Sequence, residues 1–176
     1  VIASELAFPE GPIALLDGSV VVVEIKAGRL TRVRDGDKET IAELGGGPNG
    51  AAIGPDGYCY VCNNGGFEWI ERNGKTYPGE QPASYGGGSI QKVDLQSGEF
   101  STLYAHCDGE ALKGPNDIVF DAHGGFWFTD HGKNRARDKD RTGVFYALPD
   151  GSQITEAISP LEAPNGIGLS PDEQEL

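Results

Sequence analysis

Apolar residues along the chain gather in short runs that are separated by turns rich in Gly, Asp and Asn. The strongest run, Val20–Val23, has the length of a strand, whereas a membrane-spanning helix needs about 18 consecutive apolar residues. No segment shows the spacing of apolar residues that is typical of an amphipathic helix. The pattern therefore predicts an all-β chain without a membrane segment.

One corner motif returns four times along the chain. Its form is Pro, then Glu or Asn, then Gly or Asp, followed by a short apolar run, an acidic or Gly-containing turn and, in the first three copies, a second run. Such a unit is typical of a β-hairpin. The four copies begin at Pro9, Pro48, Pro115 and Pro164.

Two further strands complete each of the first three units, and four antiparallel strands per repeat are typical of a β-propeller blade. A sandwich of independent hairpins would also have short strands and frequent turns, but it would not explain why the same corner returns in register. The added strands are predicted at 29–34, 38–43, 89–95, 99–105, 143–148 and 153–158.

We expect a single partial propeller domain over residues 1–176. Its blades are predicted at 9–44, 48–106 and 115–159, with the start of a fourth at 164–176. Because a blade takes about 40 to 45 residues and an open ring leaves an unpaired sheet edge, we expect the protein to continue past Leu176 or another chain to close the ring.

The chain is strongly acidic, with 27 Asp and Glu against 14 Lys and Arg and a formal net charge of −13. This charge would repel nucleic-acid phosphates and anionic lipid headgroups, so neither is an expected partner. The segment Val1–Phe8 lacks the basic start and apolar core of a signal peptide, so a cytoplasmic location is expected.

The three cysteines are expected to be reduced core or face residues. Cys59 and Cys62 stand three apart in a run with β character, so their side chains should lie on opposite faces of one strand. A zinc or redox pair would need both sulfur atoms on the same side.

The second residue of each corner carries the candidate chemistry. In an up-and-down blade every inner strand starts at the same face of the propeller, so these side chains should converge near its axis. One carboxylate and three amides would then meet, and oxygen donors of this kind suit calcium or magnesium, with calcium the first expectation. Alternatively, an Asn after Pro supports a turn by bonding its own backbone. The four residues are Glu10, Asn49, Asn116 and Asn165.

Two long links, at 63–88 and 131–142, should open onto the same face. Links of such length in a compact domain are usually functional, so we expect a lid or wall beside the channel. Asp130 and His131 should lie near Asn116 and are predicted to bind substrate, with His131 also a candidate base. The alternative for His131 is a structural, hydrogen-bonded role.

The stretch Lys133–Arg141 contains five basic residues against Asp138 and Asp140. It is either a solvated loop or a feature that attracts acidic substrates, such as sugar acids, to the face of the propeller where the inner strands start.

The corner motifs and the residues around them resemble those of the SMP-30/gluconolactonase family of six-bladed propellers, the regucalcin-like lactonases. The likeness covers essentially the whole chain. The matching segments are Phe8–Pro12, Gly114–Asp121 with Trp127–Asp130, and Pro164–Asp172.

The resemblance implies a divalent cation on the axis, calcium or zinc, with magnesium or manganese as further possibilities. It assigns metal binding to Glu10 and Asn165, a role shared between metal, substrate and catalysis to Asn116, and a place in the substrate pocket to Asn49. A further Asp ligand, from a later blade, has no counterpart before Leu176.

The activity that the resemblance implies is hydrolysis of a small-molecule sugar lactone. The cation would polarise the carbonyl, and an acidic side chain would activate water. Two alternatives stay open. One is a non-catalytic propeller that binds calcium structurally or docks a partner. The other is a phosphotriesterase-like or arylesterase-like activity on the same metal.

Overall fold

The computed structural model describes residues 2–176, and within that range it contains strands, turns and no helix. No helix long and apolar enough to cross a membrane is therefore found in the described part.

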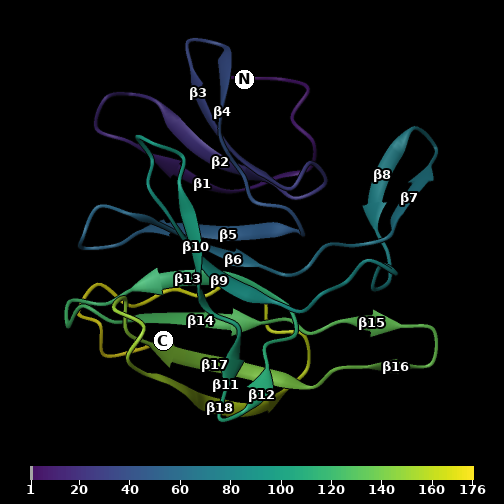
Figure 1. The fold of residues 1–176 in the computed structure, drawn as a ribbon, viewed down its shortest axis with the longest axis vertical. Helices are drawn as coiled ribbons and strands as arrows, with labels where there is room; N and C mark the ends of the chain where they lie inside the picture. Colours follow the sequence, from purple (N-terminus) through teal and green to yellow (C-terminus); the bar gives the residue numbers. More distant parts are fainter. Residues whose placement is uncertain (1) are drawn as a thin grey trace.

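Three four-stranded antiparallel sheets lie side by side (Figure 1). Sheet 1 contains β1 (Pro9–Ala14), β2 (Val20–Glu24), β3 (Arg29–Arg34) and β4 (Asp37–Glu43). Sheet 2 contains β5 (Pro48–Ile53), β6 (Cys59–Asn63), β9 (Ser89–Val93) and β10 (Phe100–Tyr104). Sheet 3 contains β13 (Pro115–Phe120), β14 (Phe126–Asp130), β17 (Thr142–Ala147) and β18 (Ile154–Leu161).

The order of strands in each sheet confirms the four-strand units predicted from the repeat. Each sheet runs from an inner strand to an outer strand in chain order. The inner strand β5 contacts both β1 and β13, so the three inner strands are neighbours. This is the arrangement of successive propeller blades.

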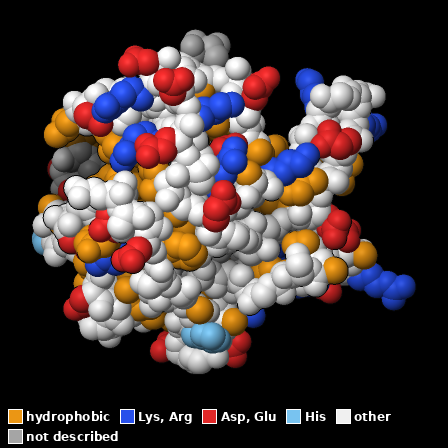
Figure 2. Space-filling view, turned by 45° about the horizontal axis from the view of Figure 1, so that its top comes forward, with side chains coloured by type: hydrophobic (Ala, Val, Ile, Leu, Met, Phe, Trp, Pro, Cys, Tyr) orange, Lys and Arg blue, Asp and Glu red, His pale blue; other side chains and the backbone are white. Residues whose placement is uncertain are grey.

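Short hairpins interrupt the links between the sheet strands. The two long links that were predicted as loops each contain one, and both project from the same side of the molecule (Figure 1). Figure 2 shows basic side chains at the ends of these projections. The hairpins are β7 (Trp69–Arg72) with β8 (Lys75–Pro78), β11 (His106–Cys107) with β12 (Glu110–Ala111), and β15 (Asn134–Arg135) with β16 (Asp138–Lys139).

Two apolar layers hold the three sheets together. Val21, Val23 and Cys59 belong to the layer between sheets 1 and 2, whereas Cys62 and Phe126 belong to the layer between sheets 2 and 3. The alternation along β6 thus places the two cysteines on opposite faces, as predicted. Both thiols are free and buried, and burial raises the pKa of Cys59 to about 12.

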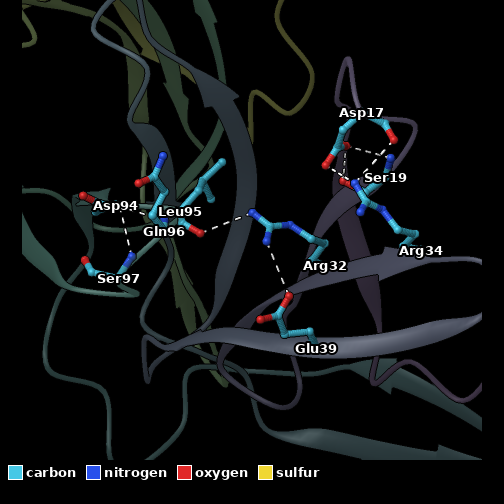
Figure 3. Close-up of polar contacts among 9 residues, drawn as sticks. All are labelled: Asp17, Ser19, Arg32, Arg34, Glu39, Asp94, Leu95, Gln96 and Ser97. Carbon is cyan, nitrogen blue, oxygen red and sulfur yellow. Dashed lines mark hydrogen bonds and ion pairs between the residues drawn. The ribbon is translucent and has the colours of Figure 1, made fainter.

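Sheets 1 and 2 are also joined by a polar contact away from the corners. Figure 3 shows Arg32 of β3 reaching across to the turn between β9 and β10. Its guanidinium donates to the Leu95 carbonyl at 3.2 Å and to Glu39 at 3.4 Å. Beside it, Arg34 pairs with Asp17 of the β1–β2 turn.

The fourth repeat unit lies outside the regular sheets. The sequence predicts the start of a blade at 164–176, but this segment forms turns and no strand. A strand needs a hydrogen-bonded neighbour, and no strand within residues 2–176 pairs with it. It rests on sheet 3 instead, where Asp117 accepts the Ile167 N–H at 3.0 Å and Glu173 accepts the Ala122 N–H at 2.8 Å.

Candidate functional site

Each inner strand begins with the same irregularity at its corner. The register with the second strand shifts between Glu10 and Ile13 in sheet 1 and between Pro48 and Ala51 in sheet 2. In sheet 3 it shifts between Pro115 and Ile118. A β-bulge re-aims the side chains next to it, so the second corner residue of each sheet lies in or beside a bulge.

The corners of successive sheets are in backbone contact. A Cβ added to Gly11 would lie 2.8 Å from the backbone nitrogen of Ala51, and one added to Gly50 would lie 2.4 Å from the carbonyl oxygen of Asn116. Only glycine permits this approach. The corners of sheets 1, 2 and 3 therefore follow one another side by side at one face.

The fourth corner is tied to the third by side chains of sheet 3. Thr129 donates to the Asn165 carbonyl at 2.5 Å and accepts the Asp117 N–H at 3.2 Å. Asp117 itself accepts the Ile167 N–H. Asp117 takes the place that glycine holds in the other three corners, so this departure from the repeat has a positioning role.

The side chains of the residues that stand second in each corner make no hydrogen bond or ion pair within residues 2–176. The backbone carbonyl of Asn165 does accept a hydrogen bond, from the Thr129 hydroxyl. The corner asparagines therefore do not support their own turns by side-chain hydrogen bonds. Side chains do support turns elsewhere in the chain: Asp56 accepts the Tyr58 N–H, and Asp121 accepts the His123 N–H. The four corner side chains are thus free to meet an external ligand.

The corner residues differ in how far they are exposed. Glu10 and Asn165 are exposed, Asn49 is half-buried, and Asn116 is only 7% exposed. The Asn116 amide atoms are not among the buried side-chain atoms that lack a partner in the described part of the chain, so they keep contact with solvent. An incoming ion or substrate can therefore reach the Asn116 amide.

The donor set suits a hard divalent cation. Glu10 supplies a carboxylate, and Asn116 and Asn165 supply amide oxygens, which are ligands that calcium accepts. Within residues 2–176 no three His, Cys, Asp or Glu side chains gather as a metal-binding group. The structure thus leaves the corner amides to complete any metal site built around Glu10.

Asp130 pairs with Pro115 of the third corner, but its carboxylate is bound by backbone N–H groups of the chain. It is 1% exposed and accepts backbone N–H groups from Lys113 and Gly114 at 2.7 Å and from Gly132 at 2.9 Å. Burial raises the pKa of Asp130, and the three backbone hydrogen bonds oppose that rise. The side chain anchors the link that enters sheet 3.

Sheets 1 and 2 have equivalents of Asp130 that sequence reasoning missed. Glu24 accepts the Ala7 N–H at 2.6 Å, and Asn63 accepts the Gly47 N–H at 2.9 Å. Each is the second-strand partner of its corner proline, at the same spacing in sequence: Pro9 with Glu24, Pro48 with Asn63, and Pro115 with Asp130. The signal was in the sequence, because a polar residue ends an apolar strand at the same distance from each corner.

His131 is half-buried directly after β14. Its backbone N–H donates to the Gly114 carbonyl at 2.9 Å, and its ring Nδ1 is buried without a partner. Burial lowers the pKa of His131, helped by Lys139 and Lys133 and opposed by the Pro164 carbonyl. The imidazole is therefore largely neutral at pH 7, the form that can accept a proton.

The basic stretch presents less positive charge than its composition indicates. Lys133 is 1% exposed, and Arg135 pairs with both Asp138 and Asp140. Arg137, Lys139 and Arg141 remain exposed. Arg141 lies 4.0 Å from Glu162, so Arg137 and Lys139 are the cations of this stretch that an acidic substrate could meet most freely.

A first test concerns the contact that holds the fourth corner. Changing Thr129 to valine keeps the shape of the side chain but removes both hydrogen bonds, so we expect a loss of about 1 to 3 kcal/mol of unfolding free energy. Amide exchange at Ile167 should accelerate. Thermal unfolding and hydrogen exchange measure the two effects, with the exposed Thr102→Val as control; equal behaviour of the two variants would contradict the assignment.

Known proteins match the chain over almost its whole length. The family described as SMP-30/gluconolactonase/LRE-like region matches residues 8–176. A gluconolactonase of Zymomonas mobilis is 27% identical over 100% of this chain and 49% of its own length. The lactonase drp35 of Staphylococcus saprophyticus is 30% identical over 90% of this chain and 44% of its own length.

A solved structure shows the same fold. A gluconolactonase from Xanthomonas campestris superposes with a TM-score of 0.72 at 23% identity, over 97% of this chain and 53% of its own. The chain spans about half the length of the relatives that it matches. With its repeated corners and the family match over residues 8–176, the chain belongs to the SMP-30/gluconolactonase/LRE-like family.

Proposed function

We propose that the protein is a metal-dependent hydrolase that opens a sugar lactone. The observation that carries the proposal is the set of corner side chains, one carboxylate and three amides, which lie on adjoining corners without internal partners. Relatives named gluconolactonase and lactonase support the reaction class. We also propose that this chain supplies three blades and the start of a fourth in a six-bladed propeller.

Glu10, Asn116 and Asn165 are the residues that would hold the divalent cation, with calcium the first candidate and zinc, magnesium and manganese the others. When bound, the cation supplies Lewis-acid chemistry, which polarises an ester carbonyl and stabilises negative charge on its oxygen. Glu10 contributes the negative charge, and the amides contribute neutral oxygen donors.

The other residues at this face bind and orient the lactone. The side-chain amides of Asn49 and Asn116 can donate to its ring or hydroxyl oxygens, because neither is engaged within the described chain. The neutral imidazole of His131 can accept a proton from a substrate hydroxyl or from water. Asp130 takes an indirect part, since its carboxylate fixes the backbone around Gly114 and Gly132.

Metal removal from the full-length protein tests the proposal. We expect glucono-δ-lactone hydrolysis, followed by acid release and corrected for the spontaneous rate, to fall at least about tenfold on chelation and to return with one of the four cations. Elemental mass spectrometry should find about one ion per complete ring.

Two outcomes would contradict it. A protein that carries no metal and shows no lactone hydrolysis would instead be a binding scaffold. Faster turnover of an aryl ester or a phosphotriester than of any lactone would keep the metal site but change the substrate class.

A further inference from the structure

The two long links on the corner face are docked against each other. We call residues 64–88 the first insertion and residues 131–141 the second insertion. The Gln81 N–H donates to the Asn134 carbonyl at 2.9 Å, and Arg135 donates to the Gln81 side chain at 3.2 Å. Although the insertions belong to different sheets, they form a continuous structure.

Lys133 is the centre of this contact. Its ammonium group donates to the Gly66 carbonyl at 2.6 Å and to Asn64 Oδ1 at 3.2 Å. The same Nζ lies 4.2 Å from the ring centroid of Phe67 and 5.4 Å from that of Tyr85. All four partners belong to the first insertion, whereas Lys133 belongs to the second.

A lysine that is 1% exposed is rare in a folded protein. Burial penalises the charge of Lys133, and its hydrogen bonds and the aromatic faces offset only part of that cost. These contacts favour the one arrangement in which all four partners surround Lys133.

The first insertion is fastened to the links that lead into the corners. The Asn64 N–H donates to the Gly47 carbonyl at 2.8 Å, directly before the corner at Pro48. The Tyr85 hydroxyl donates to the Lys113 carbonyl at 2.5 Å, shortly before the third corner. The first insertion is therefore fixed beside the second and third corners, and its contacts with the second insertion place both insertions at the boundary of the candidate site.

Aromatic side chains extend this boundary to the first corner. The Phe67 and Trp69 ring centroids are 6.0 Å apart, and those of Trp69 and Phe8 are 5.0 Å apart. Phe8 stands two residues before Glu10. The contacts thus run from the second insertion, through Lys133 and the first insertion, to the neighbourhood of Glu10.

We propose that the two insertions form one preformed wall beside the corner site, and that Lys133 is the positioning residue that holds this wall. A mobile lid would require the insertions to separate, which would take Lys133 from its four partners together. The proposal concerns the structure of the face, and only its consequence for substrate binding rests on the proposed function.

The charges around Lys133 set the direction of a pH effect. Burial lowers its pKa to about 8, while Asp130 of β14 and Asp140 of the second insertion oppose the shift. Tyr85, with its pKa raised to about 12, stays neutral, and Arg135 is engaged by Asp138 and Asp140.

The direction in which pH changes the stability of the wall depends on how many protons Lys133 binds in the closed and in the opened wall. An exposed lysine has a pKa near 10.4, so between pH 8 and that value an opened wall would bind a proton that the closed wall does not. Raising the pH through this window therefore favours the closed wall. The neutral amine still has two N–H donors for Gly66 and Asn64.

Hydrogen exchange of the full-length protein tests the wall directly. Lys133→Met fills similar space but donates nothing, so we expect exchange in both insertions to accelerate about tenfold while the three sheets keep their protection. Asn64→Leu, made on the opposite side of the contact, should loosen the second insertion as well. Arg137→Ala, at an exposed basic position of the same loop, is the control and should change neither insertion.

The outcomes separate this proposal from lactone hydrolysis. If Lys133→Met loosened only the second insertion, or neither, the insertions would be independent and the proposal would be overturned. After correction for the intrinsic exchange rate, protection in the unmodified protein should rise between pH 7 and 9, and in Lys133→Met it should not. None of these results requires activity.

A further readout applies where the lactonase proposal holds. Lys133→Met should raise KM about tenfold and leave kcat within about twofold, because the wall shapes the site but takes no part in the chemistry. A fall in kcat with unchanged KM would contradict a positioning role even if the exchange result were as expected.

Discussion

Changing Glu10 to glutamine is expected to remove the bound metal and to lower lactone hydrolysis by roughly a hundredfold or more. Glu10 is the single carboxylate among the four corner side chains, and the remaining donors are neutral amides. Glutamine keeps the size of the side chain but removes the charge that attracts a divalent cation. Because Glu10 is exposed and has no internal partner, the free energy of unfolding of the metal-free protein should change by no more than about 0.5 kcal/mol, whereas the metal-loaded protein would also lose the stabilisation that the bound ion provides.

The design separates loss of the site from loss of the fold. Metal content per chain, initial hydrolysis rate and the thermal midpoint in excess chelator are measured on Glu10→Gln and on the control Glu99→Gln, which removes an exposed carboxylate from the β9–β10 turn. Retention of metal and activity in Glu10→Gln would place the site elsewhere. Loss of metal with unchanged hydrolysis would make the cation structural.

The repeat made most of the fold predictable. Corner, strand and turn recur in register, and strand pairing is local along the chain, so the four-strand units could be found without long-range information. The hairpins β7–β8 and β15–β16 were not predicted, because the two-residue arms of β15 and β16 and the polar composition of β7 and β8 give little periodic signal. The segment at 164–176 has the motif but no strand, because pairing depends on a neighbour.

The candidate site rests on chemistry that repeats along the chain. The corner residues were proposed because four equivalent positions combine one carboxylate with three amides, and their role as ligands stays a prediction. Asp130 looked like a ligand of the substrate because a polar residue at a strand end is usually accessible, and its backbone partners at Lys113 and Gly114 become visible only in three dimensions. Lys133 was read as part of a basic stretch, since the aromatic and carbonyl groups around it come from the other insertion, far away in sequence.

Changing Gly50 to alanine is expected to be the most destabilising small substitution at the corners. The added Cβ would lie 2.4 Å from the Asn116 carbonyl oxygen and 2.7 Å from the Cα of Asp117. Both are backbone atoms of the neighbouring inner strand, so no side-chain rotation can relieve the overlap. We expect a loss of about 3 kcal/mol and a thermal midpoint lower by roughly 6 to 12 °C.

The backbone of Gly50 is not in the left-handed region, so the effect would report the overlap and not a forbidden conformation. Gly86→Ala is the matched control, because Gly86 is also outside that region and an added Cβ there would have no atom within 4 Å. Since β5 can relieve the overlap only by moving away from Asn116, Gly50→Ala should lose metal and should also unfold at a lower temperature in the metal-free state, whereas Glu10→Gln should lose metal and keep its metal-free thermal midpoint. An unchanged thermal midpoint in Gly50→Ala would mean that the corners are not in contact, and the convergence on which the metal site depends would fail with it.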